Sequence, residues 1–244
     1  MNMQAEPFLL VIATGILVML LSMALDRVWA AMIPVRVIYY LVRAPGIILH
    51  ECSHILGCLV TGAKIQKVVF FSEEGGSVTY TRPLLPWLGD VIISSAPLFC
   101  IPLVLSAITW CFATYLGCIF PAFPDTIQSM DAIRQMGTVI VSLFANNLVY
   151  HQNWWFLLYL YLTISLVLSV APSPQDLRNA AIGIVLIALA GTLIFWSNIP
   201  WATSALLEIT MLAGIGFSLG LAFGLIAFAC SLPLIVWYAH SRIR

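Results

Sequence analysis

Six apolar runs of roughly membrane-spanning length divide this chain, and they leave little room for another architecture. A bilayer core is about 30 Å thick, so a helix needs about 20 mainly apolar residues to cross it. The runs lie at residues 8–25, 37–61, 87–117, 153–172, 179–197 and 210–238. Because 62% of the 244 residues are hydrophobic and only 8% are charged, a soluble domain could not bury this much apolar surface. We expect an all-α polytopic membrane protein with six transmembrane helices and a single membrane-embedded domain over residues 1–244.

Two segments depart from this pattern. Residues 64–71 and 77–81 are rich in β-branched and aromatic side chains, and Glu73-Glu74-Gly75-Gly76 between them is a turn sequence. We therefore expect a small β-hairpin between the second and third helices. The apolar piece at residues 137–150 is too short to span the bilayer comfortably, and it is expected to be re-entrant or interfacial.

The second run carries His50-Glu51-Cys52-Ser53-His54, which reads His-Glu-x-x-His. On a helix, His50 and His54 are one turn apart and share a face. Two imidazoles at that spacing can hold one Zn²⁺, and Glu51 beside them can accept a proton from an attacking water. The alternative is a chance match, with both histidines satisfied in a polar core. The setting favours a metal site, because ionisable groups buried in a membrane are costly and usually functional.

A hydrolytic zinc site needs a third protein ligand, and Asp176 is the best candidate. The second and fourth runs are expected to cross the membrane in the same direction, which puts Asp176 on the side of the two histidines. Prolines at 172 and 174 would break the fourth helix and let the chain dip toward them. A second interpretation stays open, because Ser173-Pro174-Gln175-Asp176 is also a good helix start, with serine as N-cap and an acid at the third position.

The other acidic residues and histidines are weaker candidates for the third ligand. Asp90 is on the expected side, but it stands at the head of the third run, where a capping role is simpler. Glu208 is expected near the opposite face of the membrane. The remaining candidates are expected in loops, in the hairpin turn or in the basic tail, and they are Glu73, Glu74, His151 and His240.

Positive charges beside the apolar runs orient the chain, because the cytoplasmic loops of membrane proteins are rich in Lys and Arg. In the six-helix arrangement one side holds Lys64, Lys67, Arg82, Arg178, Arg242 and Arg244. The other side holds Arg27, Arg36 and Arg134, with Arg43 near that interface. This excess predicts a multi-pass protein of the cell membrane with both termini in the cytoplasm. The segment 1–6 lacks a basic region, so the first run is expected to be retained.

The order of these features resembles the site-2 protease family of intramembrane zinc metalloproteases. In that family a His-Glu-x-x-His helix is followed by a β region, by a span with Gly-Pro-Leu-x-Asn, and by a proline-rich Leu-Asp-Gly segment that supplies the third ligand. Here the motif at 50–54 is followed by the hairpin at 64–82, by Ala96-Pro97-Leu98 and by residues 172–176. The likeness covers about half of the chain, and it puts the catalytic core at about residues 37–180.

Three positions depart from the family pattern. Ala96 stands where the family has glycine, Cys100 where it has asparagine, and Leu177 where it has the glycine of Leu-Asp-Gly. The missing asparagine removes a polar group that could stabilise an oxyanion. The chain is therefore either a divergent protease or a relative that binds metal without cutting.

The resemblance implies a zinc endopeptidase that cleaves a membrane protein substrate within the lipid bilayer. His50, His54 and Asp176 would hold Zn²⁺, and Glu51 would act as the general base. The hairpin arms are too apolar for a free cytoplasmic loop, so they either rest on the membrane surface or offer an open strand edge to an unwound substrate. The candidates for substrate contact are Val69, Phe71, Val78 and Pro97.

Two other functions stay open. A metal transporter would need polar ligands along a path to both faces, and the external halves of the second and fourth runs show few. A non-catalytic relative that binds membrane helices is not separated from the enzyme by these residues. The formal net charge of zero gives no electrostatic case for a nucleic-acid partner.

Overall fold

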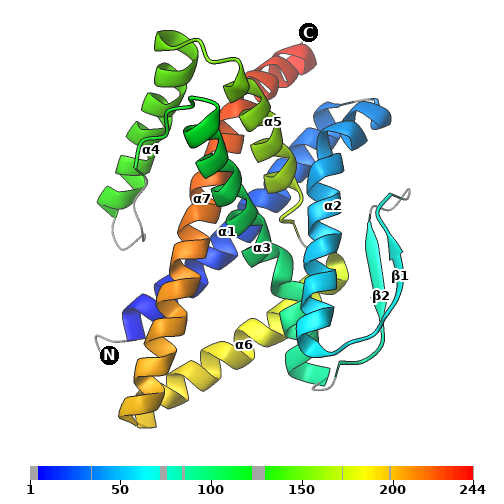
Figure 1. Cartoon of the computed structure of the whole chain (residues 1–244), viewed down its shortest axis with the longest axis vertical. Coiled ribbons are helices and arrows are strands. Elements are labelled where there is room, and N and C mark those ends of the chain that lie inside the picture. The colour runs from blue at the N-terminus through cyan, green and yellow to red at the C-terminus, as the bar shows by residue number, and fades with distance from the viewer. Residues whose placement is uncertain are drawn as a thin grey trace.

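The structure of the chain is a computed structural model, and it is mainly helical (Figure 1). It describes residues 5–33, 35–71, 76–83, 86–122, 130–171, 173–197 and 199–243. The helices are α1 (Ala5–Met32), α2 (Arg36–Thr61), α3 (Pro86–Tyr115), α4 (Met130–Phe144), a short π-helix (Ala145–Tyr150), α5 (Trp155–Leu168), α6 (Pro174–Ser197) and α7 (Pro200–Ile243). The strands are β1 (Ile65–Val69) and β2 (Ser77–Tyr80).

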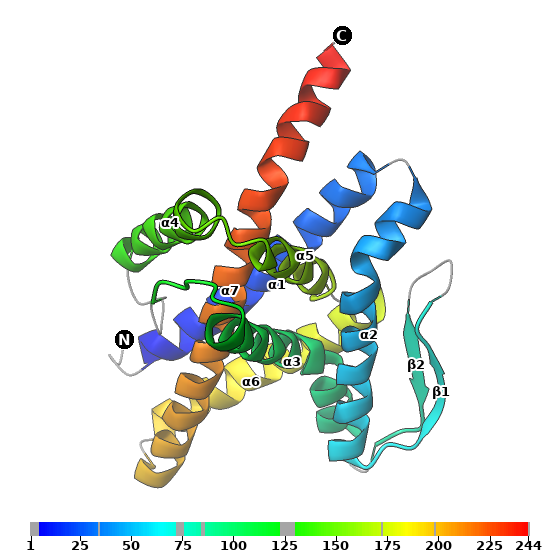
Figure 2. The same ribbon diagram turned by 45° about the horizontal axis from the view of Figure 1, so that its top comes forward.

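The helices pack around α3, which contacts α2, α5, α6 and α7. Helices α1 and α7 cross one another on one side of it, and α2 lies beside α5 on the other (Figures 1 and 2). One large apolar core joins these helices, with Tyr159, Phe156 and Ile101 among its fully buried side chains. The chain therefore holds α2 and the start of α6 close together at the middle of the molecule.

Four of the described helices are long and apolar enough to cross a membrane, namely α1, α2, α3 and α7. The expected helical membrane architecture is thus confirmed, but the count of six spans is not. The predicted span 153–172 is the 14-residue helix α5, which is about 21 Å long and falls short of the bilayer core. The predicted span 179–197 lies within the 24-residue helix α6, which is not among the four candidate spans found in the described residues. The piece at 137–150 is helical, in α4 and the π-helix.

The hairpin between the second and third helices is confirmed as a two-stranded antiparallel sheet. Helix α2 ends before Gly62, whose φ of 71° lies in the left-handed region and whose N–H bonds to the carbonyl of Cys58. This turn directs the chain into β1, which pairs with β2 so that Val68 faces Val78. Strand β2 lies between α2 and β1 in both views (Figures 1 and 2). The expected turn residues Glu73 and Glu74 lie outside the described residues.

A proline inside α2 opens the helix to α5. Pro45 has no N–H, so the carbonyl of Leu41, four residues earlier, loses its usual helical partner. The hydroxyl of Tyr161 on α5 donates to this carbonyl at 3.0 Å. The defect in one helix is therefore repaired by its neighbour, and the repair fixes the height of α5 against α2.

Helices α2 and α5 also pack closely at Gly46, the residue after Pro45. The N–H of Gly46 donates to the hydroxyl of Ser165 at 3.0 Å. A Cβ at Gly46 would overlap the carbonyl of Ser165 and the hydroxyl of Ser169, so only glycine permits this approach. Tyr161 and Ser165 on α5 and Ser169 directly after its end stand four residues apart, and they form a polar stripe along the contact with α2.

Candidate metal centre

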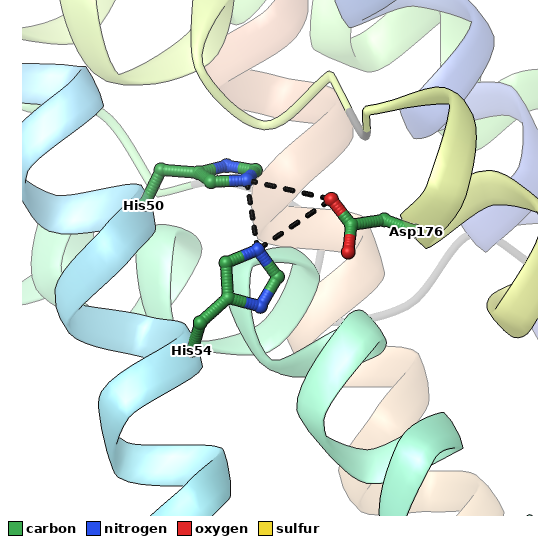
Figure 3. Close-up of side chains that lie close together, drawn as sticks. All are labelled: His50, His54 and Asp176. Atoms are coloured by element: carbon green, nitrogen blue, oxygen red, sulfur yellow. Dashed lines mark hydrogen bonds and ion pairs between the residues drawn. The ribbon is translucent and has the colours of Figure 1, made fainter. Parts of the chain in front are cut away.

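His50 and His54 lie one turn apart on α2, and Asp176 in the first turn of α6 faces both (Figure 3). The Nε2 atoms of the two histidines are 3.0 Å apart. The Oδ2 atom of Asp176 lies 3.9 Å from Nε2 of His50 and 3.5 Å from Nε2 of His54. The structure thus brings together the three residues that the sequence analysis proposed as ligands, and the group could hold a metal ion.

The spacing of the three ligand atoms fits a zinc ion. Tetrahedral zinc with bonds of 2.0–2.1 Å to nitrogen or oxygen separates its ligand atoms by roughly 3.3 Å. The separations of 3.0, 3.5 and 3.9 Å bracket that value, and shifts of a few tenths of an ångström would bring them to it. Two imidazoles and one carboxylate are also a common donor set for catalytic zinc.

Each histidine is oriented by a hydrogen bond from its other ring nitrogen. Nδ1 of His50 donates to the carbonyl of Ser169 at 2.5 Å, and Nδ1 of His54 donates to the carbonyl of Ile93 at 2.8 Å. A carbonyl can only accept, so both protons sit on Nδ1 and the Nε2 atoms carry lone pairs. Two lone pairs facing each other at 3.0 Å repel unless a cation lies between them. The centre is therefore arranged for a positive charge.

Asp176 lies beside the two histidines because α5 ends before it has passed them. Helix α5 ends at Leu168, and α6 begins at Pro174, so the chain turns beside His50 instead of running on. The N–H and hydroxyl of Ser173 donate to Oδ2 of Asp176 at 3.1 and 2.6 Å, and the N–H of Asp176 donates back to Ser173 Oγ at 3.1 Å. The helix cap and the approach to the histidines involve the same carboxylate, so the two interpretations of Asp176 are compatible.

Glu51 is buried beside the cluster and is only 4% exposed. Its Oε2 atom has no hydrogen-bond partner among the described residues. The backbone of Gly76, just before β2, lies so close that an added Cβ would come within 2.7 Å of the carboxyl carbon of Glu51. A buried carboxylate oxygen without a partner is costly, and it is available to a water or a substrate group.

An apolar cavity of about 210 Å³ opens from the metal centre into the space between α1, α3 and α7. His50 lines it at one side, and Pro97 and Leu98 line it from α3. Most of the other lining side chains are aliphatic or aromatic. The cavity is large enough for a bulky apolar side chain next to the candidate ligands.

The competing ligands lie elsewhere. Asp90 accepts a hydrogen bond from Tyr80 on β2 at 3.4 Å, and burial raises the pKa of Tyr80 to about 12, so the phenol keeps its proton. Glu208 is exposed on α7. His151 and His240 are exposed as well, and Glu73 and Glu74 lie outside the described residues.

The sequence analysis missed the residues that support the ligands, above all Ser165, Ser169, Ile93 and Gly76. A signal existed for the first two, because polar side chains four residues apart in an apolar helix indicate a face buried against protein. For Ile93 the signal was the proline four residues later, which leaves the carbonyl of Ile93 without its helical partner. No signal marks Gly76, whose contact uses backbone atoms. The proposed substrate contacts Val69, Val78 and Phe71 lie on or beside the hairpin, and Phe71 is 55% exposed. Pro97 is buried, and the role of all four stays a prediction.

A family model described as Peptidase M50B-like matches residues 9–120. The match runs from α1 through α3, and it includes the His-Glu-x-x-His helix and the hairpin. Asp176 lies beyond it, so its place in the centre rests on the geometry. No curated protein and no solved structure matches the chain.

Proposed function

We propose that this chain, which belongs to the Peptidase M50B-like family, is an intramembrane zinc endopeptidase that hydrolyses a peptide bond in a membrane-embedded helix. One observation carries the proposal. Two imidazole lone pairs and a carboxylate oxygen converge within 3.9 Å beside the buried Glu51, whose Oε2 has no hydrogen-bond partner among the described residues. Family membership makes peptide hydrolysis the chemistry to which this arrangement is most simply assigned.

The residues divide into holders of the metal and a proton carrier. His50, His54 and Asp176 would hold Zn²⁺, which supplies a Lewis acid that polarises a carbonyl and acidifies water. Glu51 would accept the proton of the attacking water and donate it to the leaving amine. Its Oε2 atom suits this role, because it has no hydrogen-bond partner among the described residues and can accept a hydrogen bond from a water.

The substrate would be bound in extended form. A helix in the bilayer has no exposed backbone groups, so it must unwind locally before water reaches a peptide bond, and the freed groups then need partners. Strand β2 lies on the α2 side of the hairpin, so its unpaired edge is toward α2, the helix that carries His50 and His54 (Figures 1 and 2). Strand addition along this edge would pair the substrate backbone, and the cavity beside His50 would receive an apolar side chain.

The decisive experiment uses the purified chain in lipid vesicles with model transmembrane substrates. We expect zinc-dependent cleavage by the wild type and none by Glu51→Gln, although both should contain zinc. Glutamine keeps the size of the side chain but cannot accept the proton, so the loss should reach several orders of magnitude. Wild-type cleavage by the glutamine variant would reject the mechanism. Zinc binding without cleavage of any substrate would instead support the non-catalytic relative.

A further inference from the structure

A second proline within a helix lies next to the candidate metal centre. Pro97 is inside α3, where its missing N–H leaves the carbonyl of Ile93, four residues earlier, without its usual helical partner. It is this carbonyl that accepts the hydrogen bond from Nδ1 of His54 at 2.8 Å. A proline inside a helix lowers the stability of the protein. Pro97 nevertheless stands four residues after Ile93, whose carbonyl orients a candidate metal ligand.

Helix α3 is also brought unusually close to α2 at this point. A Cβ on Gly57, three residues after His54, would come within 2.8 Å of Cα of Ile93. Glycine therefore lets the backbone of Ile93 approach α2 closely enough to meet the imidazole. Ile93 is 1% exposed and His54 is 6% exposed, so neither group has water as an alternative partner.

The same device occurs at the other proline of this contact region. Pro45 on α2 frees the carbonyl of Leu41, which accepts the hydroxyl of Tyr161 at 3.0 Å. The carbonyl of Ser169, which accepts the hydrogen bond from His50, also lacks a regular helical partner, because Ser169 follows the last residue of α5. Carbonyls released from helical bonding thus orient both histidines.

We propose that Pro97 is a positioning residue for the metal centre, acting through the carbonyl of Ile93. With no N–H at position 97, this carbonyl is reserved for Nδ1–H of His54, and the imidazole is held in the tautomer whose Nε2 lone pair faces His50 and Asp176. The inference rests on the proposed metal site, and it assigns Pro97 a role that does not require contact with substrate.

Any other residue at this position adds an N–H that competes for the same carbonyl. Pro97→Ala should restore a regular helix and weaken the bond to His54, so that the ring can rotate or change tautomer. Loss of a partner that orients a metal ligand typically lowers metal affinity about 10- to 100-fold. We expect a decrease of that size in the zinc affinity of Pro97→Ala, measured in detergent by competition with a chromophoric chelator.

A backbone ester at position 97 distinguishes the effect of the missing N–H on zinc affinity from the effect of the proline ring. Replacing residue 97 by lactic acid through nonsense suppression gives an alanine-like side chain without an N–H, and we expect wild-type zinc affinity. Pro102→Ala is the matched control in the same helix, because it restores an N–H opposite the carbonyl of Leu98, which is not the acceptor of either histidine. This control should also bind zinc like the wild type.

Histidine side-chain NMR of the metal-free protein gives a second readout. The wild type and the ester variant should show His54 with its proton on Nδ1, whereas Pro97→Ala should show a mixture of tautomers. Unchanged zinc affinity in Pro97→Ala, or a loss in the ester variant equal to that in Pro97→Ala, would overturn the inference. A wild type without zinc affinity would reject the proposed metal site itself, so the two failures are distinguishable.

Discussion

The backbone of Gly76 lies against the carboxylate of Glu51, so the hairpin reaches the residue proposed as the general base. An added Cβ at Gly76 would stand 2.6 Å from Cγ of Glu51 and 2.7 Å from its carboxyl carbon. Contacts this short essentially never occur for a real Cβ, so any side chain here must displace either Glu51 or the start of β2. The hairpin therefore borders the proposed catalytic site and is also a candidate surface for substrate.

Gly76→Ala should therefore impair cleavage while leaving the metal ligands in place. A displacement of about 1 Å at a catalytic group can lower the rate about 100-fold, and we expect a loss of 10- to 100-fold with unchanged zinc content. Gly216→Ala on α7 is the matched control, because nothing lies within 4 Å of the added methyl group. Equal cleavage rates for both variants would show that the contact with Glu51 has no catalytic importance.

Asp176→Asn separates the two roles of this carboxylate. Asparagine is a good cap residue at the start of α6, so the free energy of unfolding, measured by thermal unfolding, should fall by less than about 1 kcal/mol. A neutral amide is a poor zinc ligand, so zinc affinity should fall strongly. Asp90→Asn should keep full zinc, because Asp90 contacts Tyr80 and lies outside the cluster. Full zinc occupancy in Asp176→Asn would leave Asp176 as a helix cap only.

The contact between α2 and α5 should control the metal centre from a distance. In Gly46→Ala the new methyl group would overlap Ser165 and Ser169, and overpacking of this kind costs about 1–3 kcal/mol. Because the carbonyl of Ser169 orients His50, we expect lower zinc affinity together with lower thermal stability. Gly137→Ala, where the methyl group meets nothing within 4 Å, should change neither. Normal zinc affinity in Gly46→Ala would show that the two helices are not coupled to the site.

Proline scanning tests the strand edge of the hairpin. Proline removes a backbone donor, so Val78→Pro on β2 should reduce cleavage more than Val69→Pro on β1, because β2 lies on the α2 side. Zinc content should persist in both variants. Val78 also packs against Cys58 and Ile93, so thermal unfolding must accompany the assay. If neither proline changes the cleavage rate of a folded protein, the hairpin is an element of the membrane surface only.

The path of the helices also predicts the orientation of the carboxyl end. In Figure 1 the C-terminal end of α7 lies at the top of the view, whereas the start of α1 and the hairpin beside α2 both lie below it. The charge count instead predicted both termini on one side. We expect cysteines introduced at Thr79 and Ser241 in a cysteine-free background to react with impermeant reagents from opposite sides of the membrane. Reaction of both from the cytoplasm would restore the arrangement predicted from the positive charges.

The local features of this protein follow from short stretches of its amino-acid sequence. Apolar runs specify membrane helices because a bilayer leaves backbone groups no other partner, and the four-residue spacing of His50 and His54 follows from the helical period. The hairpin between α2 and α3 was equally local, since turn residues and β-branched side chains are read over a few positions. Run length alone was a poor guide at α5, whose 14 residues are fewer than a bilayer crossing needs.

The contacts between distant segments depend on how the helices pack. Asp176 was a candidate in the sequence, but only the early end of α5 and its contact with α2 bring the carboxylate to 3.5 Å from His54. Pro97 marks the carbonyl of Ile93 as lacking its helical partner, but the sequence does not show that this carbonyl meets His54. Nor does it show that the backbone of Gly76 meets Glu51, because every residue carries the same backbone groups. What each of these groups faces depends on the packing of segments far apart in the chain.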